Sequence, residues 1–152
     1  MPYRSLRETT CRHVDGSCLF ELPLAHKTLR LHAGSYRGAL AGGYDLVIDL
    51  ADALSPLAQG HHLDPVMEAW TGSRQATSLL KLAWPDQQVP HLEHQDWLDL
   101  SRSLLESRYE RVYAGCLGGH GRTGTFLAIV GCCLTELGER GIPERANPIA
   151  WV

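Results

Sequence analysis

The sequence predicts a single-domain α/β fold with a central, largely parallel sheet that is flanked by helices. Segments with the pattern of short strands alternate with segments of helical pattern. The run at residues 44–50 (YDLVIDL) is apolar enough for a strand buried on both faces. A long, almost wholly apolar helical segment follows a glycine-rich turn near the end. The chain of 152 residues is the usual length of one domain, so we expect one unit over residues 1–152.

The predicted strands are short and spread along the whole chain. Alternating or short apolar runs mark them at residues 18–24, 28–33, 44–50, 77–83 and 111–115. Glycines separate the second of these strands from the third, at Gly34, Gly38, Gly42 and Gly43. We expect a loop there.

Helices are predicted between and after these strands. Residues 93–108 carry leucines and a tryptophan at helical spacing, and residues 122–137 are apolar on nearly all sides. Asp64-Pro65 has the pattern of an N-cap followed by proline, which predicts a helical turn in the mixed segment 51–76. Asn147-Pro148 has the same pattern. The last helix is therefore expected to be truncated after one turn.

Composition and charge exclude several classes of function. The net charge is −3 and no basic tract occurs, so binding to nucleic acid or to an anionic membrane is not expected. No apolar run reaches the ~18 residues of a membrane span, and the polar N-terminus lacks the apolar core of a signal peptide. The five cysteines are unpatterned and indicate reduced thiols in the cytoplasm.

The stretch from Cys116 to Thr125 (CLGGHGRTGT) has the composition of an anion-binding loop. Its three glycines allow successive backbone N–H groups to turn toward one oxyanion. The helix that begins near Arg122 directs its positive end to the same point, and the guanidinium can hold two phosphate oxygens. A cysteine beside such a helix start is expected to ionise readily and to act as a nucleophile.

A second motif precedes this loop by about 30 residues. Trp84-Pro85-Asp86 follows a predicted strand, with a further Val-Pro at 89–90. Expulsion of an alkoxide or phenolate from phosphorus requires a proton donor, and a carboxylate on a loop can supply one. The prolines stiffen this loop and Trp84 provides an apolar anchor.

Together the two motifs resemble the protein tyrosine phosphatase superfamily. The size and order of the motifs are similar to the compact, dual-specificity-like branch, including small bacterial and phage members. The resemblance implies a phosphatase-like fold and hydrolysis of phosphomonoesters through a phosphocysteine. It implies no cofactor and no metal. The implied partners are a phosphorylated protein or peptide as substrate, and phosphate, sulfate or vanadate as ligands.

The resemblance also assigns a role to each motif residue. Cys116 is the nucleophile, Asp86 the general acid and base, and Thr123 assists departure of the sulfur. The phosphate is held by the loop residues Leu117, Gly118, Gly119, His120, Gly121 and Arg122. The acid loop is formed by Trp84, Pro85 and Asp86. Gly115 stands where the family usually has a histidine.

Two other functions are compatible with the same residues. The same chemistry could act on RNA 5′-phosphates or inositol phosphates, but Leu117, Gly118 and His120 occupy positions where lysines would suit a highly anionic substrate. A catalytically weak or dead module that binds a phospho-ligand is the alternative from a different class. The intact Cys116, Arg122 and Asp86 disfavour it.

Overall fold

The computed structural model describes residues 16–40, 43–51, 66–70, 77–82, 84–85, 88, 90, 92–118 and 121–138. Only the backbone is described for residues 66–70. The elements are β1 (Ser17–Pro23), β2 (Thr28–Ser35), α2 (Tyr36–Leu40), β3 (Leu46–Asp49), β4 (Val66–Trp70), β5 (Thr77–Lys81), α3 (His94–Glu106), β6 (Arg111–Cys116) and α4 (Gly121–Glu136).

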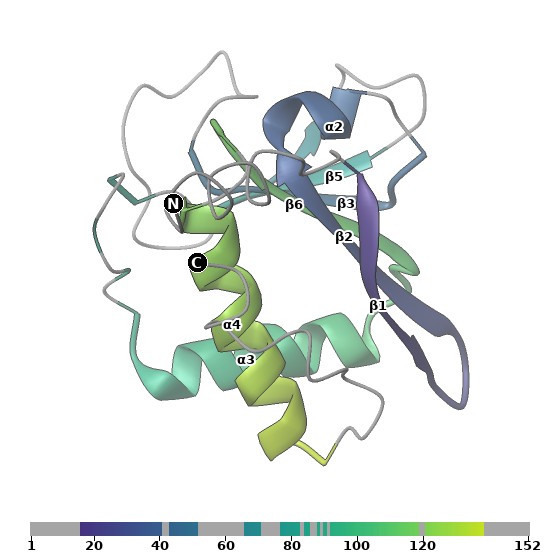
Figure 1. Ribbon diagram of the computed structural model, residues 1–152. Helices are drawn as coiled ribbons and strands as arrows, with labels where there is room; N and C mark the ends of the chain where they lie inside the picture. The colour runs from purple at the N-terminus through teal and green to yellow at the C-terminus, as the bar shows by residue number, and fades with distance from the viewer. Residues whose placement is uncertain are drawn as a thin grey trace, which may run out of the picture.

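The strands form a six-stranded sheet in the order β1-β2-β6-β3-β5-β4 (Figure 1). The four inner strands are parallel, and β1 and β4 pair antiparallel at the two edges. The predicted α/β fold with a largely parallel sheet flanked by helices is therefore confirmed. Because β2, β3, β5 and β6 run in one direction, their carboxyl ends meet at one end of the sheet, where α/β proteins bind ligands.

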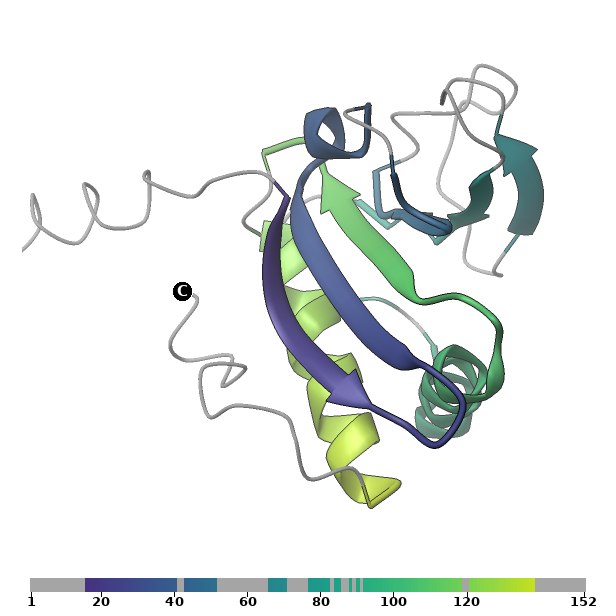
Figure 2. The same cartoon turned by 90° about the vertical axis from the view of Figure 1, so that its right-hand side faces the viewer.

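Side chains of β6 alternate between the two faces of the sheet, as the pleat requires. Val112, Ala114 and Cys116 belong to the larger core, which also contains side chains of α3 and α4. Tyr113 belongs to a smaller core with Ala39 of α2 on the opposite face. Figure 2 shows α4 and α3 behind the sheet and α2 at the carboxyl ends of its strands.

A buried lysine joins the β1–β2 hairpin to the end of α3. Nζ of Lys27 donates hydrogen bonds to the carbonyl oxygens of Leu104 and Tyr109, both at 2.7 Å, and to that of Ser107. The last carbonyls of a helix lack partners within the helix, and a cation also complements their negative dipole end. Burial lowers the pKa of Lys27. Lys27 therefore caps α3 from a distant part of the chain.

Two expectations for local structure were wrong. Part of the predicted glycine loop is helix α2, because Ala39 packs into the smaller core and Gly38 lies directly against the Tyr113 hydroxyl. The helical turn expected from Asp64-Pro65 is contradicted by β4, which begins at Val66 and pairs with β5. Strand pairing here overrides the local helix-start pattern. Asp64, Pro65, Asn147 and Pro148 themselves lie outside the described residues.

Candidate active site

Cys116 is the last residue of β6, at the carboxyl end of a central strand. Its Cα is paired with that of Ser35 on β2, and the preceding Gly115 is paired with Asp49 on β3. The residue is only 3% exposed. Pairing of β6 with β2 and with β3 fixes the backbone at the end of the strand that carries the sulfur. The chain leaves the sheet immediately after Cys116.

The Thr123 hydroxyl connects Cys116 to the first turn of α4. Its Oγ1 accepts a hydrogen bond from the backbone N–H of Cys116 at 3.0 Å. The same oxygen lies 3.1 Å from Sγ of Cys116 and 3.2 Å from the carbonyl oxygen of Gly34, and it can donate to either. Because a hydroxyl has a single proton, it donates to one of these two acceptors at a time.

Arg122 lies beside Thr123 in the first turn of α4 and is 5% exposed. Its Nη1 donates a hydrogen bond to the carbonyl oxygen of Trp84 at 3.0 Å. The guanidinium is planar, so this bond sets the orientation of the whole fork. Two segments separated by 38 positions in sequence therefore meet at this arginine.

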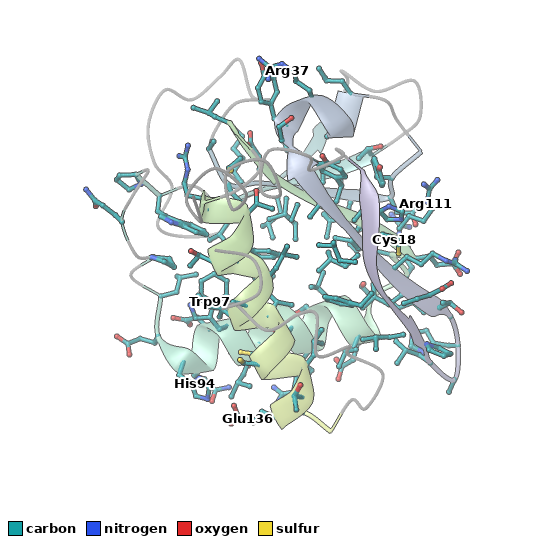
Figure 3. The ribbon with its side chains drawn as sticks, in the orientation of Figure 1. Cys18, Arg37, His94, Trp97, Arg111 and Glu136 are labelled. Atoms are coloured by element: carbon teal, nitrogen blue, oxygen red, sulfur yellow. The ribbon has the colours of Figure 1, made fainter. Side chains whose placement is uncertain are left out.

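Trp84 is anchored in the larger core and is 1% exposed. Its ring meets that of Trp97 on α3 edge to face at 6.5 Å, and Trp97 meets Phe126 on α4 in the same way at 6.1 Å (Figure 3 labels Trp97). Nε1 of Trp84 is buried without a hydrogen-bond partner among the described residues. The sequence places Trp97 and Phe126 in two predicted helices, at 93–108 and 122–137, but no local signal shows that they support Trp84.

The remaining residues of the two motifs are placed as follows. Leu117 and Gly118 are exposed directly after Cys116, and Gly121 is the exposed first residue of α4. Pro85 is half-buried beside Trp84. Asp86, Gly119 and His120 lie outside the described residues. The N-terminal end of α4, a 16-residue helix, thus closes the loop that begins at Cys116, and its partial positive charge favours an anion there.

The packing around Gly115 explains why a glycine stands there. A Cβ atom at this position would lie 3.0 Å from Cε1 of Tyr113 and 3.1 Å from the backbone carbon of Ser35. Both distances are shorter than ordinary carbon contacts. A larger residue would push on Tyr113, whose hydroxyl donates to the carbonyl oxygen of Ser35 at 2.6 Å.

Other thiols in the described residues are unlike Cys116 in their surroundings. Partial burial and Glu21 raise the pKa of Cys18, which Figure 3 shows near Arg111 on the side of β1 away from α4. Burial also raises the pKa of Cys133. A raised pKa keeps a thiol in its weakly nucleophilic protonated form. Within the described parts of the chain, no cluster of three His, Cys, Asp or Glu residues could hold a metal ion.

The family comparison identifies the class of protein. A family model described as PTP-SAK, "Swiss Army Knife protein, DSP-PTPase phosphatase domain", matches residues 57–143. That span is more than half of the chain and contains both the Trp84–Asp86 segment and the loop from Cys116 to Thr123. The chain belongs to this family, and its expected membership of the protein tyrosine phosphatase superfamily is confirmed.

Solved structures and curated proteins were compared as well. One PTPN18 structure, "Structural basis of PTPN18 fingerprint on distinct HER2 tyrosine phosphorylation sites", is similar with a TM-score of 0.48 and 15% identity over 87% of this chain. A second, "PTPN18 in complex with HER2-pY1196 phosphor-peptides", has a TM-score of 0.44 and 13% identity over 88%. The chain spans 60% and 59% of those two chains. No curated protein matches the sequence.

None of the helices among the described residues is long and apolar enough to cross a membrane.

Proposed function

We propose that the protein is a cysteine-dependent phosphatase that hydrolyses phosphotyrosine, with or without phosphoserine and phosphothreonine, in proteins or peptides. One observation carries the proposal. The Cys116 sulfur lies 3.1 Å from the Thr123 hydroxyl, at the start of the helix that also carries the buried Arg122. This arrangement combines a nucleophile, a donor to its sulfur and a cation within one turn. Membership of the phosphatase-domain family supports it.

In the first step, the Cys116 thiolate attacks phosphorus in line with the leaving oxygen. A sulfur–phosphorus bond forms as the phosphorus–oxygen bond breaks, and Asp86 protonates the departing oxygen. Arg122 and the backbone N–H groups of residues 117–122 hold the three equatorial oxygens, where charge is spread in the transition state. Phosphate, sulfate and vanadate are the anions that this loop would bind.

In the second step, water hydrolyses the phosphocysteine. Asp86, now a carboxylate, accepts a proton from the water as its oxygen attacks phosphorus, and the sulfur–phosphorus bond breaks. The sulfur departs with negative charge, and a hydrogen bond to a charged acceptor is about twice as strong as a neutral one. The Thr123 hydroxyl can donate its proton to Gly34 or to Cys116, and in this step it donates to the departing thiolate.

The bond from Arg122 to Trp84 suggests how the two motifs act together. Trp84 directly precedes Pro85 and Asp86, so the guanidinium that orients the phosphate also holds the start of the segment carrying the acid. The position of the acid and the position of the phosphate are thus coupled through the Arg122 side chain. Such positioning is a large part of catalysis in phosphoryl transfer.

Turnover of matched substrates tests the proposal. The panel contains a phosphotyrosyl peptide, a phosphothreonyl peptide, an inositol phosphate, an RNA 5′-phosphate and an activated aryl phosphate. We expect turnover of the aryl phosphate and the phosphotyrosyl peptide, with a phosphoenzyme seen by intact mass after acid quench. Binding of the peptide without any turnover would instead identify a phospho-ligand-binding module, and turnover of RNA or inositol phosphate alone would replace the substrate class.

The four described cysteines Cys18, Cys116, Cys132 and Cys133 are free thiols, which supports a cytoplasmic location. Placement in the compact dual-specificity-like branch also stays a prediction.

A further inference from the structure

Helix α2 lies at the same end of the sheet as the nucleophile. The Cα of Ser35 is paired with that of Cys116, and α2 begins at the next residue, Tyr36. Figures 1 and 2 both show α2 beside the carboxyl end of β6. Neighbouring strands lie about 4.8 Å apart and consecutive Cα atoms about 3.8 Å apart, so the Cα of Arg37 is within about 12 Å of that of Cys116.

One face of α2 is turned to the solvent. Gly38 and Ala39 pack inward against the smaller core, so Tyr36, Arg37 and Leu40 share the outer face. The Arg37 guanidinium lies over the Tyr36 ring, 5.1 Å from its centroid. Figure 3 shows Arg37 at the tip of α2, with its side chain directed away from the sheet.

The charge of Arg37 has no carboxylate partner among the described residues. Other exposed arginines do: Arg30 pairs with Glu21 at 2.8 Å and Arg102 with Asp99 at 3.2 Å. Arg108 and Arg111 are also exposed without such a partner, but they lie just before and at the start of β6 and therefore at the opposite end of the sheet. Among the described residues, Arg37 is thus an exposed cation at the nucleophile's end of the sheet that can pair with the charge of a bound ligand.

The exposed apolar side chains gather at the same end. Among the described residues, the large hydrophobic side chains that are exposed are Leu40 and Leu117, each 53% exposed. Leu40 ends α2 and Leu117 directly follows Cys116. Exposed apolar groups beside a charged group are typical of surfaces that bind another chain.

We propose that the α2 rim, formed by Tyr36, Arg37, Leu40 and Leu117, binds the polypeptide that flanks the phosphorylated residue, and that Arg37 pairs with an acidic side chain of this polypeptide. This inference rests on the proposed function. Three extended residues span about 10 Å, so the acidic residue lies one to three positions from the phosphorylated residue. Because the net charge of the chain is −3, attraction for an acidic peptide must come from such a local cation.

The test uses two phosphotyrosyl peptides that differ only in glutamate or glutamine at the flanking positions. The measured quantity is the ratio of kcat/KM for the glutamate peptide to kcat/KM for the glutamine peptide. For the wild-type protein we expect a ratio of roughly two to five, the range for one exposed ion pair, falling toward one at high salt. Arg37→Ala should bring the ratio to about one, and Arg37→Glu should invert it.

Arg108→Glu is the matched control, because it makes the same change of charge at the far end of the sheet. It should keep the wild-type ratio. A wild-type ratio near one, or equal ratios in the wild type and Arg37→Glu, would overturn the inference, as would an equal effect of Arg108→Glu. Turnover of the activated aryl phosphate distinguishes failure of the proposed function from failure of this inference. No turnover by the wild type refutes the proposed function, whereas turnover together with a ratio of one refutes only the role of the α2 rim.

Discussion

The hydroxyl of Thr123 lies 3.1 Å from Sγ of Cys116 and accepts the backbone N–H of the same cysteine at 3.0 Å. One side chain in the first turn of α4 thereby holds both the backbone and the sulfur of the last residue of β6. The proton that Thr123 donates has a second acceptor, the Gly34 carbonyl on β2. The hydroxyl therefore joins two neighbouring strands and a helix at the sulfur atom.

Replacing Thr123 with valine should slow breakdown of the phosphocysteine more than its formation, because the departing thiolate loses its donor. A hydrogen bond to a charged group contributes about 1.5–3 kcal/mol, so we expect a loss of about tenfold to hundredfold in kcat. Rapid-quench measurement should show a burst followed by slow turnover. Thr123→Ser keeps the hydroxyl and serves as the control. Equal slowing of both steps in the valine variant would contradict assistance to the leaving sulfur.

Cys116→Ser should abolish turnover and phosphoenzyme formation, since a hydroxyl is a far poorer nucleophile than a thiolate at neutral pH. The fold and the affinity for phosphate should be retained, as measured by circular dichroism and calorimetry. Cys132→Ser, an exposed thiol on α4, is the control and should stay active. Retained turnover in the Cys116 variant would refute the mechanism once contamination is excluded.

Arg122→Lys should lower both substrate affinity and kcat. Lysine keeps the charge but loses the planar fork, which donates to the Trp84 carbonyl and which the proposed mechanism uses to hold two phosphate oxygens. Steady-state kinetics on an aryl phosphate measure the effect, and Arg102→Lys on the exposed surface of α3 is the conservative control. Kinetics close to those of the wild type would mean that the fork does not contact the phosphate.

Asp86→Ala should reduce rates in proportion to how poorly the leaving group departs without a proton. Alkyl phosphates should lose most, phosphotyrosine less and activated aryl phosphates least, with general-acid assistance of about 10²–10⁴-fold where it is needed. The alkaline limb of the pH–rate profile should flatten because it reports deprotonation of this carboxyl. A uniform loss for all leaving groups with an unchanged profile would assign the acid to another residue.

Lys27→Met should destabilise the protein while leaving the residues of the candidate active site unchanged. Methionine keeps the apolar stem but leaves the carbonyls of Leu104, Ser107 and Tyr109 without their charged donor. Loss of hydrogen bonds from a buried charged group predicts a fall of about 1.5–3 kcal/mol in the free energy of unfolding, measured by urea denaturation. Arg102→Met, in an exposed ion pair, should cost less than about 1 kcal/mol.

Local sequence patterns were sufficient to predict an element where its structure depends mainly on its own residues. Residues 93–108 were predicted as a helix and the structure has α3 at His94–Glu106, because an apolar stripe at helical spacing has one way to bury itself. The same holds for α4 and for the apolar run that becomes β3. The patterns failed at α2 and at β4, where Tyr113 and β5 respectively decide the outcome.

The sequence by itself determined the candidate site residues of one motif. They are a cysteine followed at a fixed spacing by arginine and threonine, in a glycine-rich turn between a strand and a helix. Such a motif is local, and its backbone preferences and helix start can be inferred from neighbouring residues. Only the tertiary structure decided that the Trp84 carbonyl meets Arg122, that Gly34 shares the Thr123 proton, and that α2 lies beside Cys116. These contacts depend on the order in which parallel strands pair, and that order is set by burial of the whole sheet.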